Sequence, residues 1–330
     1  MKSAIETKDR RGTFYLKPSK FGLVLIVAFM LSVIFAVFLG SEKLHFSHLT
    51  PLQKQILFEI RIPRVLLGIF VGASLALSGA GLQALLRNPL AEPYLLGVSS
   101  GAALGTIISF ALSFNSDISR SLFAFLGASL ATFSVYNMAK SKTGMSIERL
   151  ALSGIIVTTL LSSIIVLLTS LLDSTKLRSF TFWLLGDLSQ ATRHAFLFVL
   201  IVCSIGLLVL LSQARALNLM MIGEKDAFDF GVEVARVKLL VFITSSALVG
   251  VSVAASGSIG YVGLVVPHLV RLVVGSDNRY VLPFSALTGA IFVVFADTLA
   301  RILIPPRELP VGAITAIIGA PMFIYLLKRT

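Results

Sequence analysis

The chain has 330 residues, of which 56% are hydrophobic and 13% are charged, against the roughly 45–50% and about 25% that are usual for soluble proteins. This composition predicts a membrane protein and excludes a disordered chain, a disulfide scaffold and a soluble enzyme. The net charge of +12 does not indicate nucleic-acid binding, because the basic residues lie mainly before the first apolar run and in short loops, where they set membrane topology.

Charges and prolines divide the chain into ten uncharged or nearly uncharged runs. We expect these runs to be transmembrane helices, because the strands of a β-barrel would show about ten residues of alternating polarity. The chain is thus predicted to be an all-α polytopic membrane protein, with a cytoplasmic tail over 1–20 and a single transmembrane domain over 21–330. The predicted spans are 21–40, 62–86, 94–114, 121–139, 150–172, 194–212, 239–256, 259–275, 281–300 and 309–327.

The seventh and eighth runs predict a short or broken pair of helices. Residues 239–270 contain no Asp, Glu, Lys or Arg, and Gly257, Gly260 and Pro267 interrupt them. Ten spans place both termini on one side of the membrane. When that side is the cytoplasm, the inside loops and tails together hold 18 Lys and Arg and the outside loops hold 10, a bias that agrees with the positive-inside rule and comes largely from the N-terminal tail.

A short pattern occurs twice and suggests an inverted internal repeat. Residues 74–79 (SLALSG) return as 252–257 (SVAASG). If five spans separate the two copies, they face opposite sides of the membrane, as in inverted-repeat transporters. Two prolines and two glycines keep the same offset: Pro89 and Pro267, Gly97 and Gly275.

The sequence offers little for catalysis or for a resident ligand. It contains no Gly-Lys dipeptide and therefore no Walker A loop. Cys203 lies in an apolar run and is expected to be a buried apolar side chain. We expect no catalytic residue and no cofactor. We also expect no metal site, because the four histidines are scattered and show no metal-ligand spacing. They are His45, His48, His194 and His268.

A proton- or ion-coupled secondary transporter is the alternative function, and it would need titratable groups inside the membrane. Asp297 and Arg301 are the best candidates, at i and i+4 near the outer end of the ninth span. This spacing favours an ion pair on one helix face over a proton relay. His268 is either a structural histidine or a residue that lines a pathway.

The stretch that decides between these classes begins at Arg61. Residues 61–64 (RIPR) precede a helix rich in small residues, and 83–93 (QALLRNPLAEP) follow it, with two prolines that bracket a non-helical loop. Over about 55–327 the chain resembles the permease subunits of the iron-chelate and vitamin B12 family of binding-protein-dependent ABC importers. Further blocks that carry the resemblance are 182–187 (FWLLGD), 260–271 (GYVGLVVPHLVR), 308–312 (ELPVG) and 319–323 (GAPMF).

This resemblance implies a homodimer in the bacterial inner membrane, with the substrate pathway at the dimer interface. Two ATP-binding subunits would dock on the cytoplasmic face and a substrate-binding protein on the outside. The complex would import an iron chelate (ferric siderophore or haem) or cobalamin by alternating access, while an oxyanion is a less common cargo. ATP hydrolysis would belong to a separate chain, so the permease itself would not be an enzyme.

The resemblance also implies a cytoplasmic coupling segment over 214–236 that docks on the ATPases. The sequence supports this independently, because several apolar side chains lie in a loop where no membrane requires them, rimmed by Glu224, Lys225 and Asp226. Packing against the chain's own helix ends is the alternative. Those apolar residues are Met220, Met221, Ile222, Phe228 and Phe230. The coupling residues expected from the resemblance are Leu217, Met220, Met221, Gly223, Glu224, Ala227, Phe228 and Gly231.

Two further sets of residues follow from the same resemblance. The cytoplasmic gate is expected at Asn88, Pro89 and Leu90, with a second gate near Ser146 and Ile147. Three arginines at outer positions resemble those with which the family meets carboxylates of its binding protein, a role that suits the planar guanidinium. They are Arg61, Arg64 and Arg301, for which interfacial anchoring is the alternative.

Overall fold

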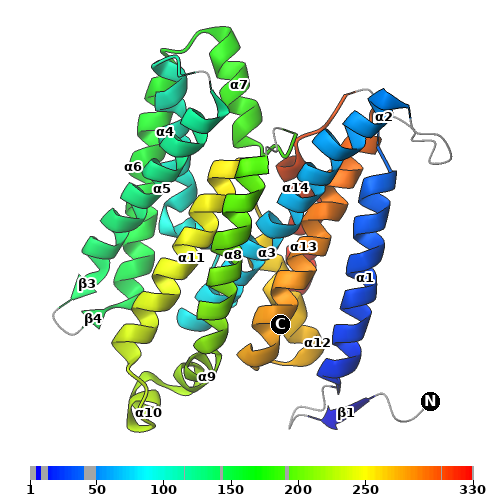
Figure 1. The fold of residues 1–330 in the computed structure, drawn as a ribbon. Helices are drawn as coiled ribbons and strands as arrows, with labels where there is room; N and C mark the ends of the chain where they lie inside the picture. The colour runs from blue at the N-terminus through cyan, green and yellow to red at the C-terminus, as the bar shows by residue number, and fades with distance from the viewer. Residues whose placement is uncertain are drawn as a thin grey trace.

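The computed structural model describes residues 5–8, 14–40, 50–114, 116–141, 144–189, 193–305 and 307–328. Over these residues the chain forms a helical bundle (Figure 1), as the composition predicts. Ten apolar helices in this part of the chain correspond to the ten predicted spans. They are α1 (Pro18–Phe38), α3 (Ile62–Leu85), α4 (Val98–Ala111), α5 (Asp117–Ala139), α6 (Ile147–Thr169), α8 (Arg193–Ser212), α11 (Val234–Ser256), α12 (Val262–Val274), α13 (Asn278–Ile302) and α14 (Val311–Leu327).

Short elements connect these helices. The helical ones are α2 (Pro51–Gln55), the π-helix η1 (Ile56–Arg61), the 3-10 helix η2 (Pro93–Leu96), α7 (Ser174–Leu184), α9 (Ala214–Ile222) and α10 (Glu224–Asp229). Two antiparallel hairpins were not predicted: β1 (Ile5–Lys8) pairs with β2 (Phe14–Leu16), and β3 (Lys140–Ser141) pairs with β4 (Gly144–Met145).

The lengths of the helices differ from the sequence prediction. In the described part of the chain, 6 helices are long and apolar enough to cross a membrane, or 7 if α8 and α9, bent by 51°, form one span. Three predicted spans form shorter apolar helices instead: α4, α12 and α14. The predicted run 94–114 was too long because Pro93 starts a 3-10 turn and Gly97, with φ of 74°, ends it before α4 begins.

The predicted interruption between the seventh and eighth spans is confirmed. α11 ends at Ser256, and α12 begins at Val262 and has 13 residues. Gly257 has φ of 68° and ψ of −169°, a conformation essentially restricted to glycine. A Cβ at Gly257 would also overlap the carbonyl oxygen of Trp183. The break therefore follows from a glycine that no other residue could replace.

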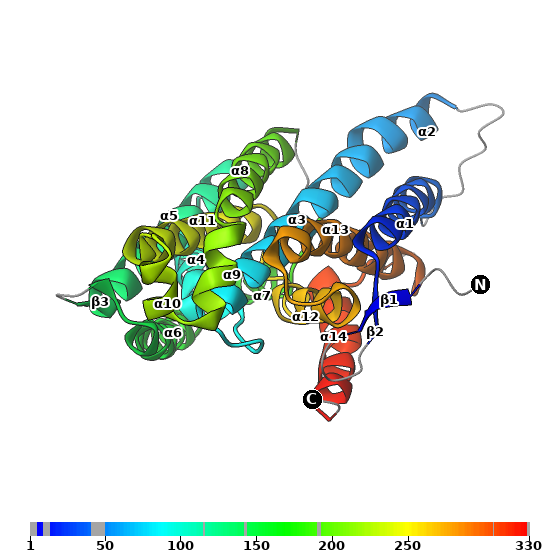
Figure 2. The same cartoon turned by 90° about the horizontal axis from the view of Figure 1, so that it is seen from below.

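Helix α3 forms the centre of the bundle. Figure 2 shows it between a group that contains α4, α5, α6 and α11 and a group that contains α12, α13 and α14. Nineteen of its 24 residues are buried, whereas only two of the 21 residues of α1 are buried. Small residues allow this packing, because they let helix backbones approach closely: a Cβ at Gly79 would overlap the carbonyl oxygen of Gly263 in α12.

The two copies of the repeated pattern lie on α3 and at the end of α11. These helices run in opposite directions in Figure 1, which is the relation that an inverted repeat requires. The prolines of the pattern differ in their local structure, because Pro89 lies in the loop after α3 and Pro267 lies inside α12. The two copies thus differ in helix direction and in local conformation, and the inverted repeat stays a prediction.

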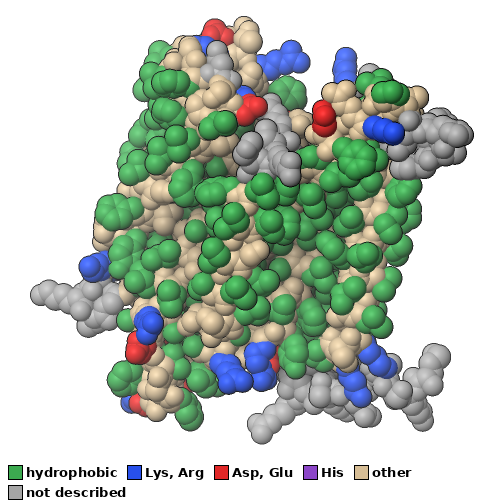
Figure 3. Space-filling view, viewed as in Figure 1, with side chains coloured by type: hydrophobic (Ala, Val, Ile, Leu, Met, Phe, Trp, Pro, Cys, Tyr) green, Lys and Arg blue, Asp and Glu red, His purple; other side chains and the backbone are tan. Residues whose placement is uncertain are grey.

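The surface has the polarity of a membrane protein. On the face shown in Figure 3, hydrophobic side chains cover the middle of the bundle, and charged side chains gather toward its two ends. The start of α1, the α9–α10 pair and the end of α14 lie toward one end, which we call the coupling end. Helices α2 and α7 lie at the opposite end, which we call the distal end.

Candidate coupling segment, gate loops and distal arginines

The predicted coupling segment forms two short helices, α9 and α10, that project from the coupling end. Gly223 separates them in an extended conformation, with φ of −178° and ψ of 145°. Leu217, Met220 and Ala227 are at most 1% exposed and join the main hydrophobic core. These three side chains fasten the helix pair to the bundle, so α9 and α10 form a packed part of the fold.

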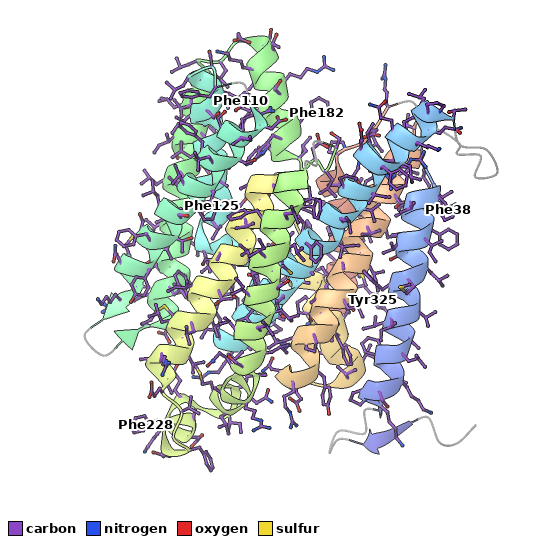
Figure 4. All side chains as sticks on the ribbon, viewed as in Figure 1. Phe38, Phe110, Phe125, Phe182, Phe228 and Tyr325 are labelled. Atoms are coloured by element: carbon purple, nitrogen blue, oxygen red, sulfur yellow. The ribbon has the colours of Figure 1, made fainter. Side chains whose placement is uncertain are left out.

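Three large apolar side chains of this segment face outward, and we call them the coupling patch: Ile222, Phe228 and Phe230, which are 70–74% exposed. Figure 4 shows Phe228 pointing away from the bundle at the coupling end. The prediction that Met220 belongs to an exposed patch was wrong, because helix packing buries it. Met221 is half-buried, and its Sδ accepts a hydrogen bond from Asn278 Nδ2 at 3.3 Å.

An amide pair formed by the half-buried Asn218 and the buried Asn278 ties α9 to the turn between α12 and α13. Asn218 Oδ1 accepts from both the backbone N–H and Nδ2 of Asn278, at 2.8 and 2.9 Å, and Asn218 Nδ2 donates to Asp277 Oδ1 at 2.7 Å. Hydrogen bonds from Arg279 to Asp277 lower the pKa of that carboxyl to about 2. Sequence reasoning missed this contact, because 60 residues separate the two asparagines and no local spacing marks them.

Glu224, predicted at the rim of the patch, makes contacts toward the bundle. Its Oε1 lies 3.1 Å from Arg87 Nη2, in the loop after α3, and its Oε2 lies 2.7 Å from Lys238 Nζ, in α11. Lys238 is 7% exposed and also donates to the carbonyl oxygen of Met145 at 3.2 Å. A buried ammonium of this kind requires a counter-ion, and Glu224 supplies it.

The first predicted gate lies in the exposed loop that follows α3. Arg87 opens the loop with φ of 49°, a left-handed conformation that costs a non-glycine residue about 1–2 kcal/mol. Asn88 then donates from its backbone N–H to Gln83 O at 3.1 Å, and its Oδ1 accepts from Leu90 N at 2.9 Å. Asn88, Pro89 and Leu90 are all exposed. Local hydrogen bonds thus shape the exposed part of this loop, which continues into the buried Ala91.

The second predicted gate, Ser146 and Ile147, lies where α6 begins, also at the coupling end. Ser146 caps α6: its hydroxyl accepts from Arg149 N at 3.4 Å and donates to Glu148 Oε2 at 2.7 Å. Both gate segments are joined to the helix pair through the contacts of Glu224 and Lys238 described above, so the fold brings coupling and gate residues together.

Two of the three predicted docking arginines cap the end of α1. Arg61 donates to the carbonyl oxygens of Val37 and Phe38 at 3.1 and 3.2 Å. Arg301 donates to those of Ala36 and Leu39 at 3.0 and 3.2 Å. The last carbonyls of a helix have no partner within the helix, and these guanidinium groups satisfy them.

The third arginine, Arg64, belongs to a buried ion network at the distal end. Its Nε donates to Asp297 Oδ1 at 2.9 Å, and its Nη1 donates to Glu308 Oε2 at 2.6 Å. Arg301 Nε lies 3.1 Å from Asp297 Oδ2, which confirms the ion pair predicted from the i, i+4 spacing. Asp297 thus lies between two guanidinium groups, an arrangement that stabilises the fold and offers no open site for a proton relay.

The three arginines that were predicted to dock the binding protein are buried. Arg61, Arg64 and Arg301 are 3–4% exposed. Docking of an outside protein through these side chains stays a prediction, and it would require their internal contacts to open.

Some of the histidines on which the predicted absence of a metal site was based lie outside the described part of the structure. In the ranges that the structure covers, no group of three or more His, Cys, Asp or Glu side chains could hold a metal ion. His45 and His48 lie outside the described residues, and the side chain of His194 is not described. His268 is buried in α12, and Cys203 is a buried free cysteine in α8.

Comparisons with known proteins agree with this arrangement. The chain is 46% identical over 276 residues to the cobalamin import system permease protein BtuC of Halobacterium salinarum, a match that covers 83% of this chain and 73% of that protein. It is 41% identical over 283 residues to the hemin transport system permease protein HmuU of Yersinia pestis, covering 83% of each.

A solved structure also matches the fold. It is assigned to the metal-chelate type of ABC transporters and is in an inward-facing conformation. It superposes with a TM-score of 0.87 and 34% identity, covering 95% of this chain and 100% of the other. The FecCD transport family matches residues 24–329. The chain therefore belongs to the FecCD transport family, whose relatives found here are permease subunits of ABC importers.

Proposed function

We propose that this chain is the transmembrane subunit of an ATP-driven importer in the bacterial plasma membrane. Two copies would form a homodimer, with the coupling end and both termini in the cytoplasm, two ATP-binding subunits on that face and a substrate-binding protein outside. The cargo would be an iron chelate (ferric siderophore or haem) or cobalamin. The names of the relatives support this choice, since one is a cobalamin import permease and another a hemin transport permease.

The coupling patch is the observation that carries the proposal. Ile222, Phe228 and Phe230 are 70–74% exposed at an end of the molecule where charged side chains gather. Large apolar side chains on such a surface are typical of a site that another protein covers. The patch is also firmly mounted, because Leu217, Met220 and Ala227 pack into the core. A force applied to the patch would therefore reach the bundle.

The pathway is proposed to lie at the dimer interface, along α6. This helix has exposed hydroxyl side chains on its surface, which donate to its own backbone: Thr159 to Ile155 O at 2.9 Å and Ser163 to Thr159 O at 3.0 Å. Exposed hydroxyls suit a wet passage better than lipid tails. In Figure 2, α6 and α14 lie on the same side of the bundle, away from α1 and α8.

The mechanism follows from these parts. ATP-driven closure of the two ATPases would move the α9–α10 pairs, and the movement would shift the helices at the dimer interface between outward and inward access. The gate loops at 86–92 and 144–147 would open or close the cytoplasmic exit. The membrane subunit would offer a passage without strong cargo contacts, and the binding protein would select the cargo.

The proposal is tested by uptake into vesicles that carry this chain with its ATPase and binding protein. Labelled ferric siderophore, haem and cobalamin are offered separately, with and without ATP. ATP-dependent uptake of one cargo is expected. Uptake that ignores ATP and follows a proton gradient would refute the proposal in favour of a secondary transporter.

The docking role of the coupling patch is tested separately with Phe228→Asp. This variant should weaken recovery of the ATPase on immobilised permease by about 30-fold, since a central interface side chain contributes about 2 kcal/mol or more. The control is Ile118→Asp in α5, because Ile118 is 78% exposed at the distal end. Equal recovery of the ATPase by both variants would contradict docking at the patch.

A further inference from the structure

We propose that Glu224 is the positioning residue that connects the α9–α10 pair to both gate loops. Through its two carboxylate oxygens, a displacement of α10 would be passed to residues 86–92 and 144–147. This inference rests on the proposed function, because it names the physical link between the surface that meets the ATPase and the loops that would close the exit.

The geometry provides one oxygen for each side of the link. Glu224 Oε1 lies 3.1 Å from Arg87 Nη2, and Glu224 Oε2 lies 2.7 Å from Lys238 Nζ. Three elements thus meet at one carboxylate: the start of α10, the loop after α3 and the first turns of α11. The Lys238 contact is a charge-assisted hydrogen bond, which is short and directional, and the Arg87 contact is an ion pair between side chains that are each 36% exposed.

The Arg87 branch leads directly to the first gate. Arg87 precedes Asn88, and its left-handed backbone, with φ of 49°, is held by a hydrogen bond to Ala84 O at 3.4 Å and by the pair with Glu224. A strained residue keeps its conformation only when its surroundings fix it. Movement of Glu224 would therefore alter the direction in which the loop leaves α3, and with it the positions of Asn88 and Leu90.

The Lys238 branch leads to the second gate. Lys238 Nζ donates to the carbonyl oxygen of Met145 at 3.2 Å, and Met145 precedes Ser146, the N-cap of α6. Met145 is 7% exposed, and Ser146 N donates to Ala139 O at 3.3 Å. The lysine thus joins α10 to the start of the helix proposed to line the pathway.

Glu224→Gln tests the link with little change in shape. A carboxylate accepts from both cations, whereas an amide has one acceptor oxygen, so the variant loses at least one branch. The matched control is Glu59→Gln, outside the coupling segment. Glu59 is exposed in η1 and accepts from Gln55 Nε2 at 3.1 Å, a contact within one helical turn that joins no elements distant in sequence.

The assay measures cargo taken up per ATP hydrolysed by the full complex in vesicles. Glu224→Gln should recover the ATPase normally, continue to hydrolyse ATP and lose at least about fivefold in uptake per ATP. Arg87→Gln and Lys238→Gln should each lower the same ratio. Glu224→Gln combined with Arg87→Gln should lower it by less than the product of the two single effects, because both changes act on the same link. Glu59→Gln should behave as the wild type.

A second readout reports the link without transport. Spin labels at Leu90 and Asp229, in a Cys203→Ala background, should give a narrow distance distribution in the wild type and a broad one with Glu224→Gln. The inference is overturned if Glu224→Gln keeps both the uptake ratio and the narrow distribution, or if it loses the ATPase, since Glu224 would then be a docking residue. A wild-type complex without ATP-dependent uptake would refute the proposed function instead. The distance distribution between the two spin labels would still test whether Glu224 holds the loop after α3 to α10.

Discussion

Replacing Asp297 by Asn should destabilise the bundle strongly, because this carboxylate neutralises two buried cations. The side chains of Asp297, Arg64 and Arg301 are 3%, 5% and 4% exposed, so little water can take over. Removing one member of a buried ion pair typically costs about 3–5 kcal/mol. Two remaining contacts reduce the loss in the free energy of unfolding: Glu308 still binds Arg64, and Arg301 keeps its carbonyl partners at the end of α1. We therefore expect about 3 kcal/mol.

The assay is reversible unfolding in mixed micelles, with the free energy of unfolding obtained from the denaturant midpoint and slope. Glu233→Gln is the control, since an exposed ion pair contributes about 0–1 kcal/mol. Arg301→Met should cost less than Asp297→Asn, because Arg64 then still pairs with Asp297 and the partly exposed Glu308. An Asp297→Asn variant within about 1 kcal/mol of the wild type, or the reverse order of the two variants, would refute the reasoning.

Two further predictions concern packing and acid stability. Gly79→Ala should abolish folding, because a Cβ there would overlap the Gly263 carbonyl oxygen. In the control Gly81→Ala, the nearest atom to the new Cβ is Ser245 Oγ at 3.3 Å. Gel filtration should show a normal yield of monodisperse protein for Gly81→Ala and none for Gly79→Ala. The lowered pKa of Asp277, about 2 against the usual 3.8, means that its stabilising contribution is complete above about pH 4 and is lost as the pH falls toward 2. Unfolding curves across this range should show the loss in the wild type and a flatter pH dependence with Asp277→Asn.

Much of the fold could be predicted from local sequence. The ten apolar runs identify the ten helices of the bundle, because a bilayer requires long uncharged stretches and every such stretch must satisfy its own backbone. The break between α11 and α12 was predicted from Gly257 and Pro267 for the same local reason. The run 94–114 was predicted too long because hydropathy does not reveal the 3-10 turn that Pro93 begins and Gly97 ends.

The predicted functional residues were chosen by motif, but their surroundings were not predictable. The resemblance placed coupling residues in 214–236, and the structure separates them into buried anchors such as Met220 and an exposed patch that includes Phe228. Both are large apolar residues in the same short segment. Which of them faces the bundle depends on how α9 and α10 pack, and that is a property of helices distant in sequence.

The sequence by itself determined the class of protein, the number of apolar helices and the family, because composition, run length and contiguous motifs are local properties. Only the tertiary structure decided the partners of the charged residues. Arg64 meets Asp297 across 233 positions of the chain, and Lys238 meets the Met145 carbonyl across 93. Arg301, for which docking of a partner protein stays a prediction, caps the end of α1. In a membrane-spanning bundle a buried charge must find a counter-charge or a carbonyl wherever the helices bring one, and local sequence does not contain that information.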